Sequence, residues 1–311
     1  MTNIRQKQVI FFFILCGIAF SVAISACKMY YNTQKVDYRV SSDRDGLQEG
    51  KRLTMLTCAG CHYNPDTKKL TGVRMSDVPK IAGKVYSRNI TQDPDKGIGK
   101  YTDGELVYLI RTGIARDGKL MPYMQRPNLA NKDLNDIIAF LRSNDELVTP
   151  SKESPPLTHY SVFGKFGLSK YSSPLPYSDK KIERPDLAKD KVAYGRYMVD
   201  NLSCFHCHSA GITKINVMEP EKSKRYMGGG FKMKTPGGEK ILTSNLTFDE
   251  TGIAGWTEHD FIRAVKDGFN KDNAVLRIPM PKYSELSDEE AGAIYAYLKT
   301  IPKIKNKVPR K

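Results

Sequence analysis

The sequence contains little cysteine, histidine or tryptophan, with 6 Cys, 5 His and 1 Trp among 311 residues. It also lacks the composition of a disordered chain, because 40% of its residues are hydrophobic and 27% are charged. Its net charge is +15, but the lysines are scattered and no nucleic-acid-binding motif accompanies them. We therefore expect no nucleic acid partner. The length is sufficient for two domains of ordinary size.

A single long apolar run, residues 9–26, follows a short basic segment at the N-terminus. The run is long for the apolar part of a signal peptide and short for a transmembrane span. It ends in Ile24-Ser25-Ala26-Cys27, which resembles a bacterial lipobox and implies cleavage after Ala26 and acylation of Cys27. An uncleaved N-terminal anchor helix is the alternative. Both interpretations predict an exported chain that is tethered to the membrane and faces the periplasm.

Four of the cysteines form two pairs, and a histidine follows each pair. The two motifs read Cys58-Ala59-Gly60-Cys61-His62 and Cys204-Phe205-His206-Cys207-His208. Two thiols at this spacing lie on one helical turn and reach the two vinyl groups of a haem, and the next histidine lies under the iron. The sequence therefore predicts two covalently bound haem c groups. His206 is at the variable position between two cysteines and is expected to point outward.

The sequence around the two motifs repeats itself. Each copy has an Asn-x-Thr segment, a Gly-Ile segment that leads to an aromatic residue and a threonine, and a Met-Pro pair. The corresponding residues are Asn89 and Asn245, Tyr101 and Trp256, and Met121 and Met280. We expect the asparagines to have a structural role in a loop and not to be glycosylated. The two aromatic residues are expected either beside a haem propionate or in the core.

A haem that only carries electrons needs a sixth iron ligand, and a methionine thioether raises its reduction potential. Met121 and Met280 each precede a proline, which helps to fix the backbone beside the sulfur. We expect iron to be bound by His62 with Met121, and by His208 with Met280. Met124 competes with Met121 for the first position.

Apolar residues at helical spacing predict six helices. They cover residues 46–56, 104–114, 134–142, 192–202, 261–268 and 291–299. Capping-box patterns begin three of them, at Thr102, Thr257 and Ser287. Glycines at positions 50 and 195 are unfavourable within helices, so we expect the last helix of each copy to cross there closely, with Phe140 and Tyr297 against the bare backbone.

These motifs resemble class I cytochrome c domains in tandem. More narrowly, they resemble the haem c subunits of bacterial membrane-bound alcohol, aldehyde and gluconate dehydrogenases, although that family usually has three haem motifs and this chain has two. The resemblance implies an all-α fold of two helical haem domains. The six prolines between positions 149 and 186, with little helical periodicity around them, predict an extended linker between the domains. The expected boundaries are 1–26 for the signal peptide or anchor, 27–45 for a tether, 46–148 for the first domain, 149–186 for the linker, 187–304 for the second domain and 305–311 for a basic tail.

The expected function is electron transfer without bond chemistry, so the chain itself is not expected to be an enzyme. Its partners would be a dehydrogenase, an oxidase or another cytochrome. The alternative is a dihaem peroxidase, which needs one haem with an open coordination position and acid–base groups beside it. A Met-Pro candidate for each iron argues against that alternative.

Overall fold

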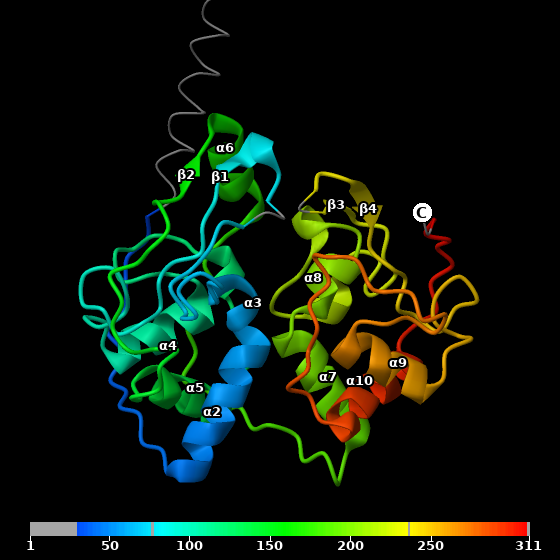
Figure 1. Ribbon diagram of the computed structural model, residues 1–311, viewed down its shortest axis with the longest axis horizontal. Coiled ribbons are helices and arrows are strands. Elements are labelled where there is room, and N and C mark those ends of the chain that lie inside the picture. Colours follow the sequence, from blue (N-terminus) through cyan, green and yellow to red (C-terminus); the bar gives the residue numbers. More distant parts are fainter. Residues whose placement is uncertain (1–29, 76–77, 236, 310–311) are drawn as a thin grey trace, which may run out of the picture.

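The computed structural model describes residues 30–75, 78–235 and 237–309. Its helices form two groups that lie side by side (Figure 1). The first half contains α2 (Arg44–Thr57), α3 (Ala59–His62), α4 (Asp103–Thr112) and α5 (Asn131–Leu141). The second half contains α7 (Lys191–Asn201), α8 (Cys204–His208), α9 (Glu258–Asp267) and α10 (Asp288–Thr300). The six predicted helices are therefore present, each within a few residues of its expected bounds.

The close helix crossings expected at the two glycines are confirmed. A Cβ atom on Gly50 of α2 would lie 2.0 Å from the carbonyl oxygen of Asp136 in α5. A Cβ atom on Gly195 of α7 would lie 1.9 Å from the carbonyl oxygen of Ala293 in α10. Phe140 approaches Gly50 as expected, whereas the atoms nearest to the Cβ position of Gly195 belong to Ala293 and Ile294 and not to Tyr297. Backbone carbonyls make the closest contacts in both crossings. Glycine is required there because any side chain would separate the two helices.

All three predicted capping boxes are formed. Thr102, Thr257 and Ser287 each accept a hydrogen bond from the backbone N–H three residues later, and the acidic side chain at that position accepts one from the cap residue. These bonds satisfy N–H groups that the first turn of a helix leaves without partners. They fix the starts of α4, α9 and α10.

The fold is mainly helical, but it also contains two small antiparallel sheets. Strands β1 (Gly83–Lys84) and β2 (His159–Tyr160) form one sheet, and β3 (Lys232–Lys234) and β4 (Lys240–Leu242) form the other. The all-α prediction is therefore correct for the main elements and misses these short strands. The predicted domain boundaries stay a prediction.

The segment between the two groups was predicted to be extended throughout, and this was wrong. It contains β2 and the helix α6 (Val162–Tyr171), which begins at Ser161, whose hydroxyl accepts from the Gly164 N–H at 3.0 Å. Gly164 allows α6 to lie against the backbone of Ala82, whose carbonyl oxygen would be 2.1 Å from an added Cβ. This tertiary contact stabilises a helix that has little amphipathic pattern of its own.

Only some of the aromatic side chains of this segment pack on the rest of the protein. Tyr177 packs against Tyr108 of α4 with their ring centroids 5.7 Å apart. Phe163 and Phe166 of α6, in contrast, are 69% and 46% exposed.

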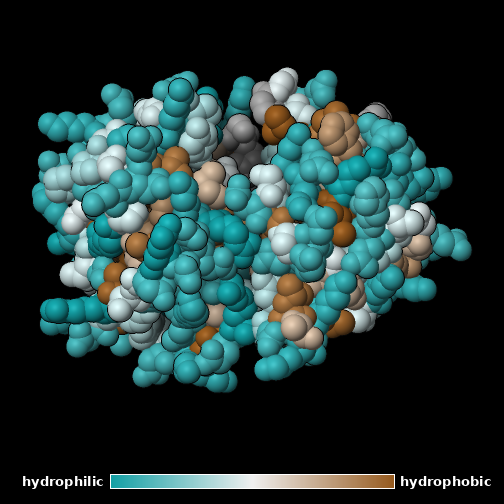
Figure 2. All heavy atoms as spheres, turned by 60° about the horizontal axis from the view of Figure 1, so that its bottom comes forward, coloured by the Kyte–Doolittle hydropathy of each residue, from teal (hydrophilic) through white to brown (hydrophobic). Residues whose placement is uncertain are grey.

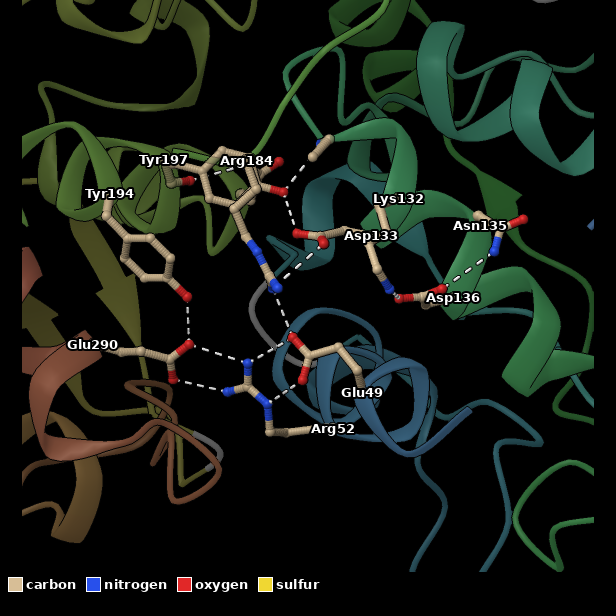
Figure 3. A network of polar contacts seen from close by, with 12 residues as sticks. Glu49, Arg52, Lys132, Asp133, Asn135, Asp136, Arg184, Tyr194, Tyr197 and Glu290 are labelled. Carbon is tan, nitrogen blue, oxygen red and sulfur yellow. Dashed lines mark hydrogen bonds and ion pairs between the residues drawn. The ribbon is translucent and has the colours of Figure 1, made fainter. Parts of the chain in front are cut away.

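A network of charged side chains joins the two halves (Figure 3). Arg52 of α2 donates to both carboxylate oxygens of Glu290 in α10, at 2.8 and 3.1 Å. Arg52 also donates two hydrogen bonds to Glu49, which receives a third, of 2.7 Å, from Arg184. Tyr194 of α7 donates to Glu290 at 2.5 Å. Burial would raise the pKa of Glu49, but Arg52 and Arg184 outweigh it and lower the pKa to about 2.

A second polar contact lies beside this network. Tyr197 of α7 donates to Asp133 of α5 at 2.5 Å and accepts from the Ala130 N–H at 3.0 Å. Both side chains are buried. The hydrophobic core is also continuous across the boundary, because Leu53 and Ile138 belong to the same cluster as Val199 and Leu298. Packing and buried hydrogen bonds therefore hold the two halves together.

The predicted N-terminal anchor, with residues 9–26 and Cys27, lies outside the described residues. Among the helices of the described residues, none is both long enough and apolar enough to cross a membrane.

We predict that Gly50→Ala and Gly195→Ala each lower the free energy of unfolding by about 3 kcal/mol, because the added methyl group forces a packed helix pair apart. Gly167→Ala in α6 is the matched control, because nothing lies within 4 Å of the Cβ position there. It should leave stability unchanged or raise it by about 1 kcal/mol. Denaturant unfolding checks this, and equal effects in all three variants would contradict the crossing geometry.

We predict that Arg52→Met destabilises the protein by about 2–3 kcal/mol at pH 7, because it leaves Glu49 and Glu290 with one cation fewer in a largely buried site. The pKa of Glu49 is lowered from 4.5 to about 2, so its stabilisation is present above pH 4.5 and is lost as the pH falls toward 2. The gap between wild type and variant should narrow over that range.

Lys51→Met is the control for this experiment. Lys51 is 49% exposed and pairs with Asp145 at the surface, so its loss should cost less than about 0.5 kcal/mol. Denaturant unfolding at several pH values gives both numbers, and similar losses in the two variants would show that the network is not stabilising.

Candidate haem sites

The first cysteine motif forms a single helical turn directly after α2. The N–H groups of Cys61 and His62 donate to the carbonyl of Cys58 at 3.1 and 3.0 Å. Because α2 ends at Thr57, its crossing with α5 determines where this turn lies. The second motif likewise lies directly after the first helix of its half, because α8 contains Cys204, Cys207 and His208 and follows α7 closely. Each predicted group of two cysteines and one histidine is therefore brought together on one turn.

Both predicted proximal histidines have the same hydrogen bond. His62 Nδ1 lies 2.7 Å from the carbonyl oxygen of Arg88, and His208 Nδ1 lies 2.8 Å from that of Ser244. An Nδ1–H that donates to a carbonyl leaves the lone pair of Nε2 for a metal and fixes the orientation of the ring. Burial lowers the pKa of both histidines, which favours the neutral form that binds iron.

Two glycines bring these carbonyl groups close to the motifs. Gly72 has φ +87° and its Cβ position lies 2.5 Å from the carbonyl oxygen of Ser87, the residue before Arg88. Gly229 has φ +65° and its Cβ position lies 2.4 Å from the carbonyl oxygen of Ser244. The N–H groups of the two glycines also donate to the carbonyls of His62 and His208, each at 2.8 Å. The loop around each histidine is thus built in the same way.

The Asn-x-Thr segments follow the two carbonyl groups and are buried. Asn89 Nδ2 donates to the carbonyls of Ser151 and Glu153 at 2.8 Å, and Asn245 Nδ2 donates to that of Ile304 at 2.7 Å. Each asparagine therefore ties its loop to the chain just beyond the last helix of its half. The structural role expected for these residues is confirmed, because their amide groups are used inside the protein.

Trp256 provides a direct test of whether a haem fits the second site. Its indole N–H is buried and has no hydrogen-bond acceptor among the described residues. A buried donor without an acceptor is unfavourable, and a haem propionate is an acceptor of suitable charge. In the first half, burial raises the pKa of Tyr101 and the charge of Arg88 opposes this rise. The residues present therefore fit the group that the motifs predict.

Both candidate methionine ligands lie in tight loops. Met121 comes directly before the short 3₁₀ helix Pro122–Met124, and its N–H donates to the carbonyl of Gly113 at 2.6 Å. The Met280 N–H donates to the carbonyl of Arg277 at 3.1 Å. Both side chains are half-buried. Met124 packs against the hydrophobic core, which is an ordinary role for methionine. The pairing of each methionine with its histidine stays a prediction.

The expectation that His206 points outward was wrong. Its ring packs edge-on against Phe205 with centroids 4.5 Å apart, and its Nε2 atom is buried without a hydrogen-bond partner among the described residues. Burial, with a contribution from the positive charge of Arg126, lowers the pKa of His206 to about 3. The position between the cysteines faces the other half of the protein, which the motif alone does not reveal.

The groups that orient the histidines were not predicted from the sequence. Arg88 and Ser244 each stand immediately before a repeated Asn-x-Thr segment, so the repeat contained a signal for them. Arg126 and Tyr283 belong to no repeated motif and gave no such signal.

Comparison with known proteins agrees with this geometry. Residues 47–145, which include the first cysteine motif, match the family described as cytochrome c. This part, about a third of the chain, is similar to that family. The resemblance to cytochrome c that the motifs indicate is therefore confirmed for the first half of the chain.

Relatives match a much longer part of the chain. The cytochrome c subunit of a quinone alcohol dehydrogenase from Gluconobacter oxydans is 27% identical over 85% of this chain and 56% of its own length. The fructose dehydrogenase cytochrome subunit from Gluconobacter japonicus is 27% identical over 84% of this chain and 54% of its own. A dihaem cytochrome c-type protein from Cereibacter sphaeroides is 27% identical over 79% of this chain and 82% of its own length.

The chain thus spans about half the length of the two dehydrogenase subunits that it resembles. These names describe cytochrome subunits and agree with the prediction of an electron-transfer chain that is not itself an enzyme.

We predict that the fluorescence of Trp256, the single tryptophan, is quenched in the haem-loaded protein, because a haem absorbs the light that tryptophan emits. The double variant Cys204→Ser/Cys207→Ser should recover more of this fluorescence than Cys58→Ser/Cys61→Ser. Emission spectra of the three proteins, compared at equal concentration, make the test. Stronger recovery of fluorescence in the Cys58/Cys61 variant would show that Trp256 lies closer to the first haem than to the second, contrary to the assignment made here.

Proposed function

We propose that the protein is a dihaem c-type cytochrome that carries electrons between redox partners of the periplasm and the membrane. The observation that carries this proposal is the repeated geometry, in which a Cys-x-x-Cys-His turn, a histidine bonded to a backbone carbonyl and a crossing glycine occur in both halves. The similarity to a protein named as a dihaem cytochrome supports the count of two.

Each proposed residue has a distinct task in this function. Cys58 and Cys61 would hold the first haem by thioether bonds, and Cys204 and Cys207 the second. His62 with Met121, and His208 with Met280, would bind the two irons. A haem supplies an iron that cycles between the ferrous and ferric states. The protein contributes the axial ligands, the burial and a fixed separation between the two sites.

The alternative of a peroxidase requires one iron with an open position. A ferric optical and electron paramagnetic resonance spectrum distinguishes the two functions. Low-spin, methionine-ligated signals from both haems are expected for an electron carrier, whereas one high-spin haem would favour the peroxidase.

The partner is proposed to be a dehydrogenase, as the names of the relatives suggest, or an oxidase or another cytochrome. Most of the face in Figure 2 is covered by hydrophilic side chains, with hydrophobic ones scattered over both halves. Together with the net charge of +15, this favours docking to an acidic partner surface, with association that weakens as salt is added.

We predict that Met280→Ala and Met121→Ala each remove the sixth ligand of one iron and lower the reduction potential of that haem, because the thioether stabilises the ferrous state. Met124→Ala is the matched control for Met121, since Met124 lies in the same loop and packs in the core. Redox titration followed by absorbance measures both potentials. If Met124→Ala lowers the potential and Met121→Ala does not, the ligand in the first half is Met124.

We predict that the mature protein begins at an acylated Cys27. Mass spectrometry of the N-terminal peptide from membranes of the native host measures this directly. An intact Met1 would instead show that residues 9–26 stay as an uncleaved anchor.

A further inference from the structure

Arg126 lies in the loop that follows Pro122–Met124, and its backbone is held from two sides. Its N–H donates to the carbonyl of Ile110 at 2.7 Å, and Arg111 Nη1 donates to its carbonyl at 3.3 Å. A backbone fixed in this way aims the long side chain at a defined place in the interior.

The side chain of Arg126 is largely buried, and none of the described residues gives it a carboxylate partner. Its Nη1 donates to the carbonyls of Tyr123 and Gln125 at 3.2 and 2.8 Å, whereas its Nε is buried and has no partner among the described residues. Burial lowers its pKa, and no Asp or Glu of the described residues is among the groups that oppose this effect. A buried cation without an anion is costly, so such a charge calls for a functional reason.

The groups that surround this charge belong to both candidate haem sites. In the first site, the charge of Arg126 acts on the thiols of Cys58 and Cys61. From the second half it faces the ring of His206 and the hydroxyl of Tyr283.

Tyr283 connects the two sites further. The Tyr283 hydroxyl lies 3.5 Å from the carbonyl oxygen of Leu202 and is buried near cysteines of both motifs, namely Cys61, Cys204 and Cys207. In Figure 1 the two motif-bearing helices, α3 and α8, lie next to each other where the two halves meet. Arg126, His206 and Tyr283 therefore belong to one cluster that lies near cysteines of both motifs.

We infer that Arg126 sets the reduction potentials of the two haems as a fixed positive charge between their cysteine-linked edges. This inference rests on the proposed function, because it requires both haems to be attached. Reduction removes one positive charge from a haem, so a cation held nearby in a water-poor interior favours the reduced state. The effect is largest for the first haem, whose cysteines Arg126 faces directly, and smaller for the second. It does not vary with pH, because arginine stays protonated.

The test compares Arg126→Gln, Arg126→Lys and the control Arg116→Gln. Arg116 is in the same half, is 45% exposed and pairs with Glu105, so its variant has the same change of net charge at the surface. Potentials of both haems are measured by redox titration at low and high salt, and the ferric spectrum reports whether methionine ligation is intact.

We expect Arg126→Gln to lower the equilibrium constant for reduction of one haem at least tenfold, which is about 59 mV for one electron. The shift should persist at high salt, since buried charges are weakly screened. Arg126→Lys and Arg116→Gln should each change that constant less than threefold.

Unchanged potentials in Arg126→Gln would overturn the inference, as would an equal shift in Arg126→Lys. Loss of the methionine-ligated spectrum in both Arg126 variants would overturn it too, because Arg126 would then act only by supporting its loop. If wild type contains fewer than two haems, the proposed function itself fails, and this is measured before any variant is compared.

Discussion

The absence of a side chain at two helix crossings is the constraint on which the rest of the structure depends. Gly50 and Gly195 allow α2 and α7 to lie directly against the backbones of α5 and α10. Within a few residues of their ends, α2 and α7 are each followed by a Cys-x-x-Cys-His turn. The crossing therefore decides where two thiols and a histidine lie relative to the loops that complete each site.

The interface between the two halves is held by buried charged groups as well as by apolar packing. Arg52 and Glu290 are 238 residues apart in the sequence, yet their two hydrogen bonds connect α2 with α10. Arg126 brings a second positive charge to the boundary, next to cysteines of the first site. Charges placed in this way are costly unless they are compensated. We interpret the first network as fixing the separation of the two sites and Arg126 as acting on their potentials.

Much of this architecture could be predicted from the sequence because it depends on local patterns. Helical periodicity and capping boxes gave the helices, and the glycines within them gave the crossings. The short helix α6 was missed because its sequence has little amphipathic pattern, and its position depends on contact with Ala82. His206 was misjudged for a similar reason, since the local motif says nothing about the opposing half. Arg126 could not be found at all, because a lone arginine in a loop has no pattern that reveals what it faces after folding.

The central claim is that each half of the chain holds one covalently bound haem. Haem content per chain, determined from intact mass and from the absorbance of the pyridine complex, tests it most directly. Two haems are expected in wild type, and one in each of the variants Cys58→Ser/Cys61→Ser and Cys204→Ser/Cys207→Ser. A wild-type protein with a single haem, or a cysteine-pair variant that still contains two, would contradict it.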